Sequence, residues 1–186
     1  MPKFIIVGLD HFLQNLDQKA LTEEGRRYEA DQQQRFAGVL EEIIERNGVT
    51  LICEEGKFDA ESLGGALARK HECRPPVNIT TPKNERERLG ISEYYEDDPV
   101  QKARAIRLFE EYMASLVQQT TRNDDVVLLM VGDVHRSEMQ RRMAEIGTVV
   151  EVQGLHDFEW YEGPPAEEPG TGAFLGSWKR ITGDFV

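Results

Sequence analysis

Two Gly-x-x-His elements carry the residue types in this chain that are best suited to chemistry. The first joins Gly8 to His11, and the second joins Gly132 to His135. Glycine lets the backbone turn sharply and lets a ligand approach closely. Histidine can exchange a proton near neutral pH or bind a metal ion. The repeated pattern therefore predicts a site that contains two imidazoles.

A pair of glutamates, Glu54 and Glu55, follows a third apolar run in the chain. With the two histidines, one glutamate completes a set of two nitrogen ligands and one oxygen ligand, which is typical of open catalytic metal sites. We therefore expect His11, Glu54 and His135 to bind a divalent metal ion. A water molecule on that ion would be the nucleophile, and Glu55 would act as the general base.

A site without a metal ion is equally consistent with these residues. One histidine and Glu54 would then activate water directly, while an arginine or backbone N–H groups stabilise the oxyanion. The helix expected after His135 would place this imidazole at the positive end of the helix dipole, which disfavours protonation of the ring. Asp10 and Asp133 precede the two histidines. They would either orient the histidines as hydrogen-bond acceptors or cap the next element.

The same residues also admit more ordinary roles. Both histidines could hydrogen-bond to loop backbone at strand ends, and the two glutamates could form a solvated pair. The charged segment 84–88 and the arginines Arg104 and Arg107 could hold an anionic substrate. Mixed charges of this kind more often form a solvated face.

The elements that must position these residues follow from an alternation of apolar runs and amphipathic segments, which is typical of βαβ units. Strands are expected at residues 3–8, 49–53, 77–79, 126–131 and 148–150. Helices are expected at residues 30–47, after an N-cap at Asp59, from about residue 99 and at residues 135–146. Because parallel strands end at one edge of their sheet, the three motif loops can converge there.

The length of 186 residues and the hydrophobic share of 39% fit one globular domain. We expect an α/β fold with a mainly parallel sheet flanked by helices at residues 1–153, followed by an irregular C-terminal arm at residues 154–186. The arm is rich in aromatic residues and in proline and glycine. Its aromatic side chains need an apolar cover, either from the same domain or from a second subunit in a homodimer.

Composition also bears on partners and location. The formal net charge of -12 would repel a nucleic-acid backbone, so nucleic acid is not an expected partner. No apolar run is long enough to span a bilayer, and the chain is expected to be soluble and cytoplasmic, with no membrane partner.

Cys53 and Cys73 are expected to be reduced thiols. Neither Gly8 nor Gly132 begins a phosphate-binding loop.

The two Gly-x-x-His elements and the strand-end glutamate resemble the TraB, PrgY and Tiki group and its erythromycin-esterase-like and ChaN-like relatives. The resemblance covers residues 3–150. It implies hydrolase or metal-dependent peptidase chemistry, with an ester or a peptide or amide bond in a small-molecule or peptide substrate. It also implies binding or regulatory roles in some relatives. Because this chain lacks the helical insertions of the larger members, the alternative is a non-catalytic ligand- or peptide-binding module.

Overall fold

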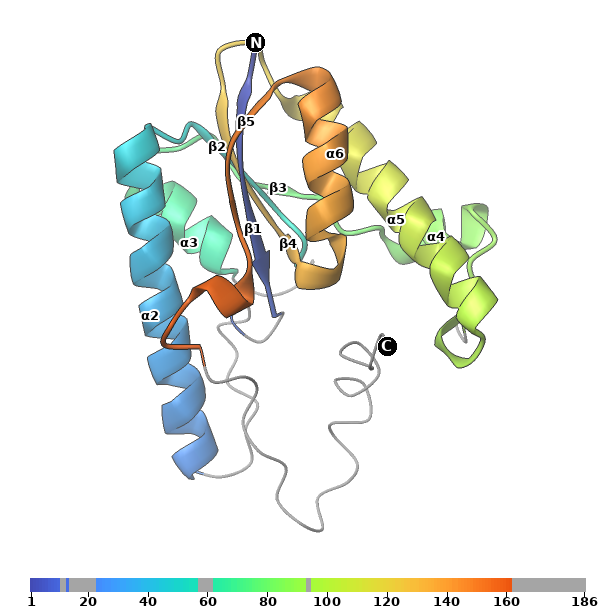
Figure 1. Cartoon of the computed structure of the whole chain (residues 1–186), viewed down its shortest axis with the longest axis horizontal. Helices are drawn as coiled ribbons and strands as arrows, with labels where there is room; N and C mark the ends of the chain where they lie inside the picture. The colour runs from blue at the N-terminus through green and yellow to red at the C-terminus, as the bar shows by residue number, and fades with distance from the viewer. Residues whose placement is uncertain (11–12, 14–22, 57–61, 93–94, 162–186) are drawn as a thin grey trace.

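The computed structural model describes residues 1–10, 13, 23–56, 62–92 and 95–161. Five strands form one sheet in the order β3-β2-β4-β1-β5, and every pair of neighbours is parallel (Figure 1). This confirms the expected α/β class. The strands are β1 (Lys3–Leu9), β2 (Leu51–Glu54), β3 (Val77–Asn78), β4 (Val126–Gly132) and β5 (Thr148–Gln153).

Helices cover both faces of the sheet (Figure 1). The α-helices are α2 (Glu23–Asn47), α3 (Leu63–Lys70), α4 (Lys83–Arg88), α5 (Pro99–Thr120) and α6 (Arg136–Ile146). Three short 3-10 helices are η1 (Tyr95–Asp97), η2 (Asp133–His135) and η3 (Leu155–Asp157). Apolar residues from alternate strand positions pack under α2 and α3 on one face, and the intervening positions pack under α5 and α6 on the other. Both faces of the central strands are therefore buried, as parallel sheets require.

Local capping fixes where the helices begin. The Asp98 carboxylate accepts a hydrogen bond of 2.8 Å from the Val100 N–H, and Pro99 occupies the first turn of α5. Both choices suit a helix start, because these N–H groups have no partner inside the helix. At α3 the N-cap is Ser62, whose hydroxyl accepts a hydrogen bond from Gly65 N–H. Ser62 therefore takes the place predicted for Asp59, which lies outside the described residues.

The three strands that carry the motif residues are neighbours in the sheet. Leu9 of β1 pairs with Gly132 of β4, and Glu54 of β2 pairs with Met130 of β4. Since the connection from β1 to β2 skips one position and β4 later fills it, the two Gly-x-x-His strands lie side by side. The ends of β1, β4 and β2 therefore meet at one edge.

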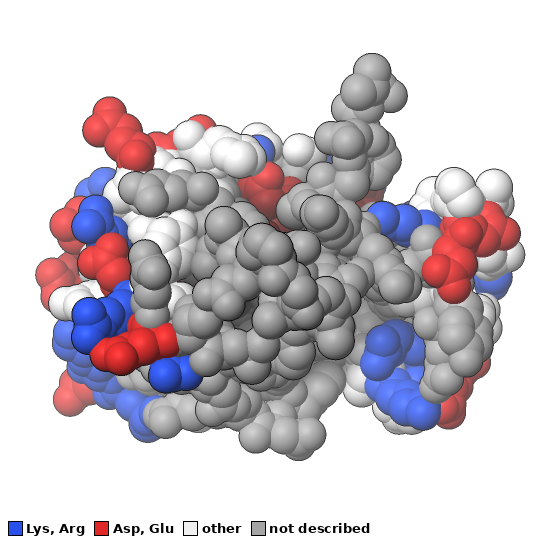
Figure 2. Space-filling model, turned by 90° about the horizontal axis from the view of Figure 1, so that it is seen from below, with Lys and Arg blue, Asp and Glu red and all other residues white. Residues whose placement is uncertain are grey.

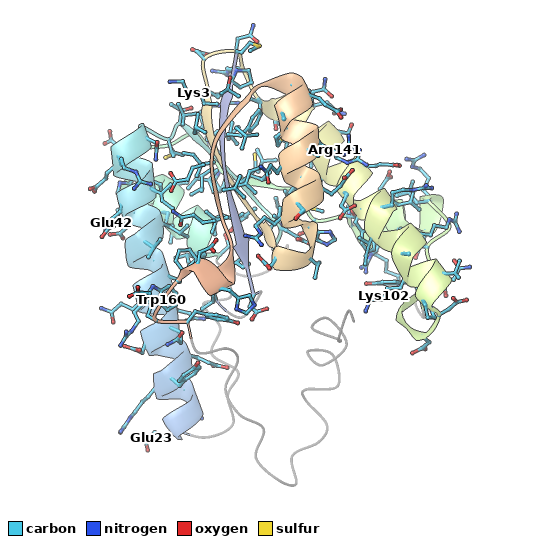
Figure 3. All side chains as sticks on the ribbon, in the orientation of Figure 1. Lys3, Glu23, Glu42, Lys102, Arg141 and Trp160 are labelled. Atoms are coloured by element: carbon cyan, nitrogen blue, oxygen red, sulfur yellow. The ribbon has the colours of Figure 1, made fainter. Side chains whose placement is uncertain are left out.

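The beginning of the predicted C-terminal arm packs on its own domain. Phe158 joins the core beneath α2, and its ring lies 6.1 Å from that of Phe36. Trp160 stacks on Phe158 at 5.4 Å and lies beside α2 (Figure 3). These two aromatic side chains are thus covered by the chain itself. Phe174, Trp178 and Phe185 lie outside the described residues.

The structure also bears on the cysteines and on membrane-spanning helices. Both cysteines are free, and burial raises the pKa of the Cys53 thiol to about 12. A thiol with such a pKa stays protonated and is a poor nucleophile. None of the helices in the described ranges is long and apolar enough to cross a membrane.

Two glycines provide a matched test of the packing. A Cβ at Gly147 would lie 2.6 Å from the Phe4 ring and from the Pro2 carbonyl oxygen, whereas a Cβ at Gly38 in α2 would meet no atom within 4 Å. We expect Gly147→Ala to lower the free energy of unfolding by about 1–3 kcal/mol through overpacking. Gly38→Ala should raise it by about 0.5–1 kcal/mol because alanine favours the helix. Urea unfolding of both variants measures the difference, and equal effects would contradict the packing described.

Candidate functional site

A buried imidazole lies at the edge where the strands end. His135 is the last residue of η2, directly before α6, and its side chain is 7% exposed. Both ring nitrogens face carboxylates. Nδ1 lies 3.1 Å from Oε1 of Glu110, and Nε2 lies 3.7 Å from Oε1 of Glu55. The ring is therefore held between two acids contributed by different elements.

Glu110 is contributed by α5 and contacts Nδ1, the ring nitrogen that does not face Glu55. It is 6% exposed and occupies the buried face of α5, three residues before Met113 and seven before Val117. That spacing places all three side chains on one side of the helix. Glu110 was not among the predicted site residues; its sequence signal is a carboxylate on an otherwise apolar helix face.

Glu55 follows β2 and is fixed by the neighbouring strand. Its second oxygen, Oε2, accepts a hydrogen bond of 2.9 Å from Gly132 N–H, and its own N–H donates to the Met130 carbonyl oxygen at 2.9 Å. The next residue, Gly56, is held by hydrogen bonds to polar side chains. Its N–H donates to the Thr80 hydroxyl at 2.8 Å. The Asn78 amide donates to the Gly56 carbonyl at 3.1 Å. The hydrogen bonds to β4 and those of Gly56 thus hold Glu55 in its position beside His135.

The expectation that the helix dipole keeps the His135 ring neutral is wrong, because the pKa of the ring is raised. Burial lowers the pKa of the imidazole, but the hydrogen bond with Glu110 and the charges of Glu55 and Glu110 outweigh burial, so the pKa of His135 lies above its ordinary value. The physical reason is distance, since carboxylates in contact with the ring act more strongly than the partial charge at a helix end. The structure therefore favours a protonated ring where the sequence predicted a neutral one.

Glu54, the glutamate expected to join His135, lies on the opposite face of the sheet. Its carboxylate accepts hydrogen bonds from the Ser62 hydroxyl and, at 3.1 Å, from Gly64 N–H at the start of α3. Burial raises the pKa of Glu54, although these hydrogen bonds oppose the shift. A Cβ at Gly64 would lie 2.5 Å from one Glu54 oxygen, so the helix start is built around this carboxylate. The structure therefore brings Glu55, and not Glu54, next to His135.

The first histidine, His11, which was expected to join Glu54 and His135, lies outside the described residues. No three His, Cys, Asp or Glu side chains are grouped to hold a metal ion within the described ranges. His135 and Glu55 nevertheless have a suitable separation for two ligands of one ion. Two atoms about 2.1 Å from a shared metal ion are about 3–4 Å apart, and Nε2 and Oε1 are 3.7 Å apart.

The two motif aspartates have different partners. Asp133 lies 3.2 Å from the Nε of Arg136, and one of its carboxylate oxygens occupies the space where a Cβ at Gly8 would lie. Asp10 accepts a hydrogen bond from the Tyr161 hydroxyl. Gly8 is therefore required for the close approach of the β4 loop to β1. These contacts of the aspartates are not with His135; in the described structure the acceptor at its Nδ1 is Glu110.

The arginines predicted to face either a substrate or solvent have partners outside the site. Arg88 pairs with Glu85 at 2.6 Å, and Arg107 lies 3.8 Å from Glu111 on the exposed side of α5. Arg104 donates to the Leu89 carbonyl oxygen at 3.3 Å. Figure 2 views the molecule from the edge where the strands end, with positive and negative side chains mixed along both flanks. These contacts agree with a solvated face.

No protein-family model matches the chain, and no curated protein or solved structure is significantly similar to it.

The charge of His135 can be tested by replacing its partner. We expect Glu110→Gln to lower the pKa of the imidazole, because burial remains while one negative charge is lost. Titration of the ring signals by NMR in metal-free protein measures the change. Glu111→Gln, which alters the next and more exposed acid on α5, is the control.

The same shift predicts how stability depends on pH. A raised pKa in the folded state means that protonated His135 favours folding, so its contribution is complete below the pKa of the unfolded histidine, about 6.5. It is lost as the pH rises through the higher folded value. Glu110→Gln should flatten this dependence, and an unchanged dependence would contradict the ion-pair geometry.

Proposed function

We propose that this chain is a hydrolase that cleaves an ester or an amide bond in a small-molecule or peptide substrate, with His135, Glu55 and Glu110 as its acid–base machinery. The observation that carries the proposal is the buried imidazole with one carboxylate on each ring nitrogen, at 3.1 Å and 3.7 Å. Buried, charge-paired titratable groups at the carboxyl edge of a parallel sheet are common at catalytic sites.

The geometry assigns a separate task to each group. Glu55 is the general base that takes a proton from the attacking water. The protonated Nε2 of His135 is the general acid that gives a proton to the leaving oxygen or nitrogen. Glu110 accepts the hydrogen bond from Nδ1–H and so fixes the ring orientation and favours its charged form. The carbonyl carbon gains the hydroxyl and loses the leaving group, and one proton moves from Glu55 to His135 before the next cycle.

A version that uses a divalent metal ion belongs to the same proposal. His135 Nε2 and Glu55 Oε1 would hold the ion, with His11 as the expected third ligand. An ion at that position would act as a Lewis acid and lower the pKa of water. Glu110 would then orient the histidine in the metal site as it does in the free ring, by accepting the hydrogen bond from Nδ1–H.

Hydrolysis of ester and amide panels tests the proposal. We expect His135→Ala and Glu55→Gln to lower kcat/KM by about 100-fold or more, the usual loss when an acid–base group is removed. Glu54→Gln keeps the side-chain shape on the other face of the sheet and should retain most activity. His11→Ala tests the contribution of the first motif.

The matched glutamates make the outcome informative. Equal losses in Glu54→Gln and Glu55→Gln would contradict the assignment of Glu55. If a panel compound raises the melting temperature of the protein but is recovered unchanged, the chain is a non-catalytic binding module on the same scaffold.

Titration of metal-free protein with Zn²⁺ or Mn²⁺ by calorimetry tests the metal-dependent version. We expect binding by the wild type and at least a tenfold weaker affinity in His135→Ala, because a ligand is lost. His71→Ala is the control, since His71 caps the far end of α3 and lies 4.0 Å from Glu45. Equal affinity in the wild type and His135→Ala would rule out this ligand set.

A further inference from the structure

The segment that follows β5, residues 154–161, contacts the loops of both Gly-x-x-His elements. Tyr161 donates its hydroxyl hydrogen bond to Asp10, next to His11 in the first element. Asp157 lies 3.6 Å from Nη1 of Arg136, which follows His135 in the second element. Two loops that are distant in the sequence are therefore joined through one short segment.

The segment is anchored so that these contacts have a fixed geometry. Asp157 accepts a hydrogen bond of 2.6 Å from Gly154 N–H, which closes the turn of η3. The backbone N–H of Tyr161 donates to the Phe158 carbonyl oxygen at 2.9 Å. Phe158 and Trp160 stack and pack on Phe36 of α2. The phenol of Tyr161 is thus carried by a segment that is attached to the core.

Arg136 also contacts both the loop after β4 and the backbone of the segment at Gly154. Its Nε lies 3.2 Å from Asp133, and its guanidinium fills the space where a side chain at Gly154 would lie. A Cβ at Gly8 would come within 3.1 Å of the Arg136 Cδ. The arginine therefore crosses from the start of α6 over β1 to η3, and the two glycines leave room for it.

We propose that Tyr161 is a positioning residue of the site: by holding Asp10 it fixes the start of the loop that carries His11, while Arg136 and Asp157 fix the loop that carries His135 to the same segment. The proposal rests on the proposed function and adds a group that neither Gly-x-x-His element contains. Tyr161 acts through Asp10 and has no role in the chemical step. A hydroxyl that bonds a carboxylate gives one of the stronger hydrogen bonds in proteins, so its loss should loosen this loop.

Hydrogen exchange at the Leu13 amide reports directly on this loop. Leu13 N–H donates to the Asp10 carbonyl oxygen at 3.0 Å, and the Leu13 side chain is buried. We expect Tyr161→Phe to speed exchange at Leu13 by about tenfold, as the loss of a charge-assisted hydrogen bond implies. Tyr112→Phe removes the same atom from the side of α5 away from Glu110 and should leave the rate unchanged. Equal rates in the two variants would overturn the proposal.

A double-mutant cycle separates positioning from general stability. If Tyr161 acts through Asp10, Tyr161→Phe and Asp10→Asn together should accelerate exchange no more than the stronger single variant. Additive effects would overturn the proposal.

With a substrate that the wild type hydrolyses, Tyr161→Phe should lower kcat and leave KM within about twofold, because the phenol positions the loop and does not bind substrate. If the wild type hydrolyses nothing, the proposed function fails, while exchange at Leu13 still decides the role of Tyr161.

Discussion

His135 has both ring nitrogens directed at carboxylates in a place that excludes most water. Burial alone would favour a neutral ring, whereas Glu110 and Glu55 favour the charged form and outweigh burial. An ion pair in such surroundings is stable only if each charge keeps its partner, since an unpaired buried charge costs several kcal/mol. The positions of α5, β2 and the turn after β4 are therefore coupled, because each supplies one member of this group.

The alternation of side chains along a strand divides the two adjacent glutamates between two environments. Leu51 and Cys53 of β2 pack under α5 and α6, and Glu55 continues that series toward His135. Ile52 packs under α2 and α3, and Glu54 continues that series to the start of α3. Residues two apart lie on the same face of a strand. One carboxylate therefore organises a helix start, while its neighbour contacts the imidazole.

The sheet order places these groups near one another. β4 fills the position between β1 and β2, so the loops after all three strands share one edge. Gly8 permits Asp133 to approach β1 closely, and Arg136 then extends over β1 to the segment after β5. The packing of Phe158 and Trp160 on α2 gives that segment its fixed position. The described edge is thus tied together from four of the five strands and from α2.

The sequence by itself determined the fold class, the strands that carry the motif, the start of α5 at Pro99 and the end of α6 before Gly147, because these depend on local hydrophobic periodicity and capping. It also placed a histidine and a glutamate at strand ends, whereas the adjacency of β2 and β4 is given by the sheet order. Tertiary structure decided the rest. Which glutamate meets His135 depends on which face of β2 lies under α5, and the choice of Glu110 depends on how α5 packs. The charge of the imidazole depends on both, since contacts between residues 25 and 80 positions apart in the sequence outweigh the local effect of the helix that follows.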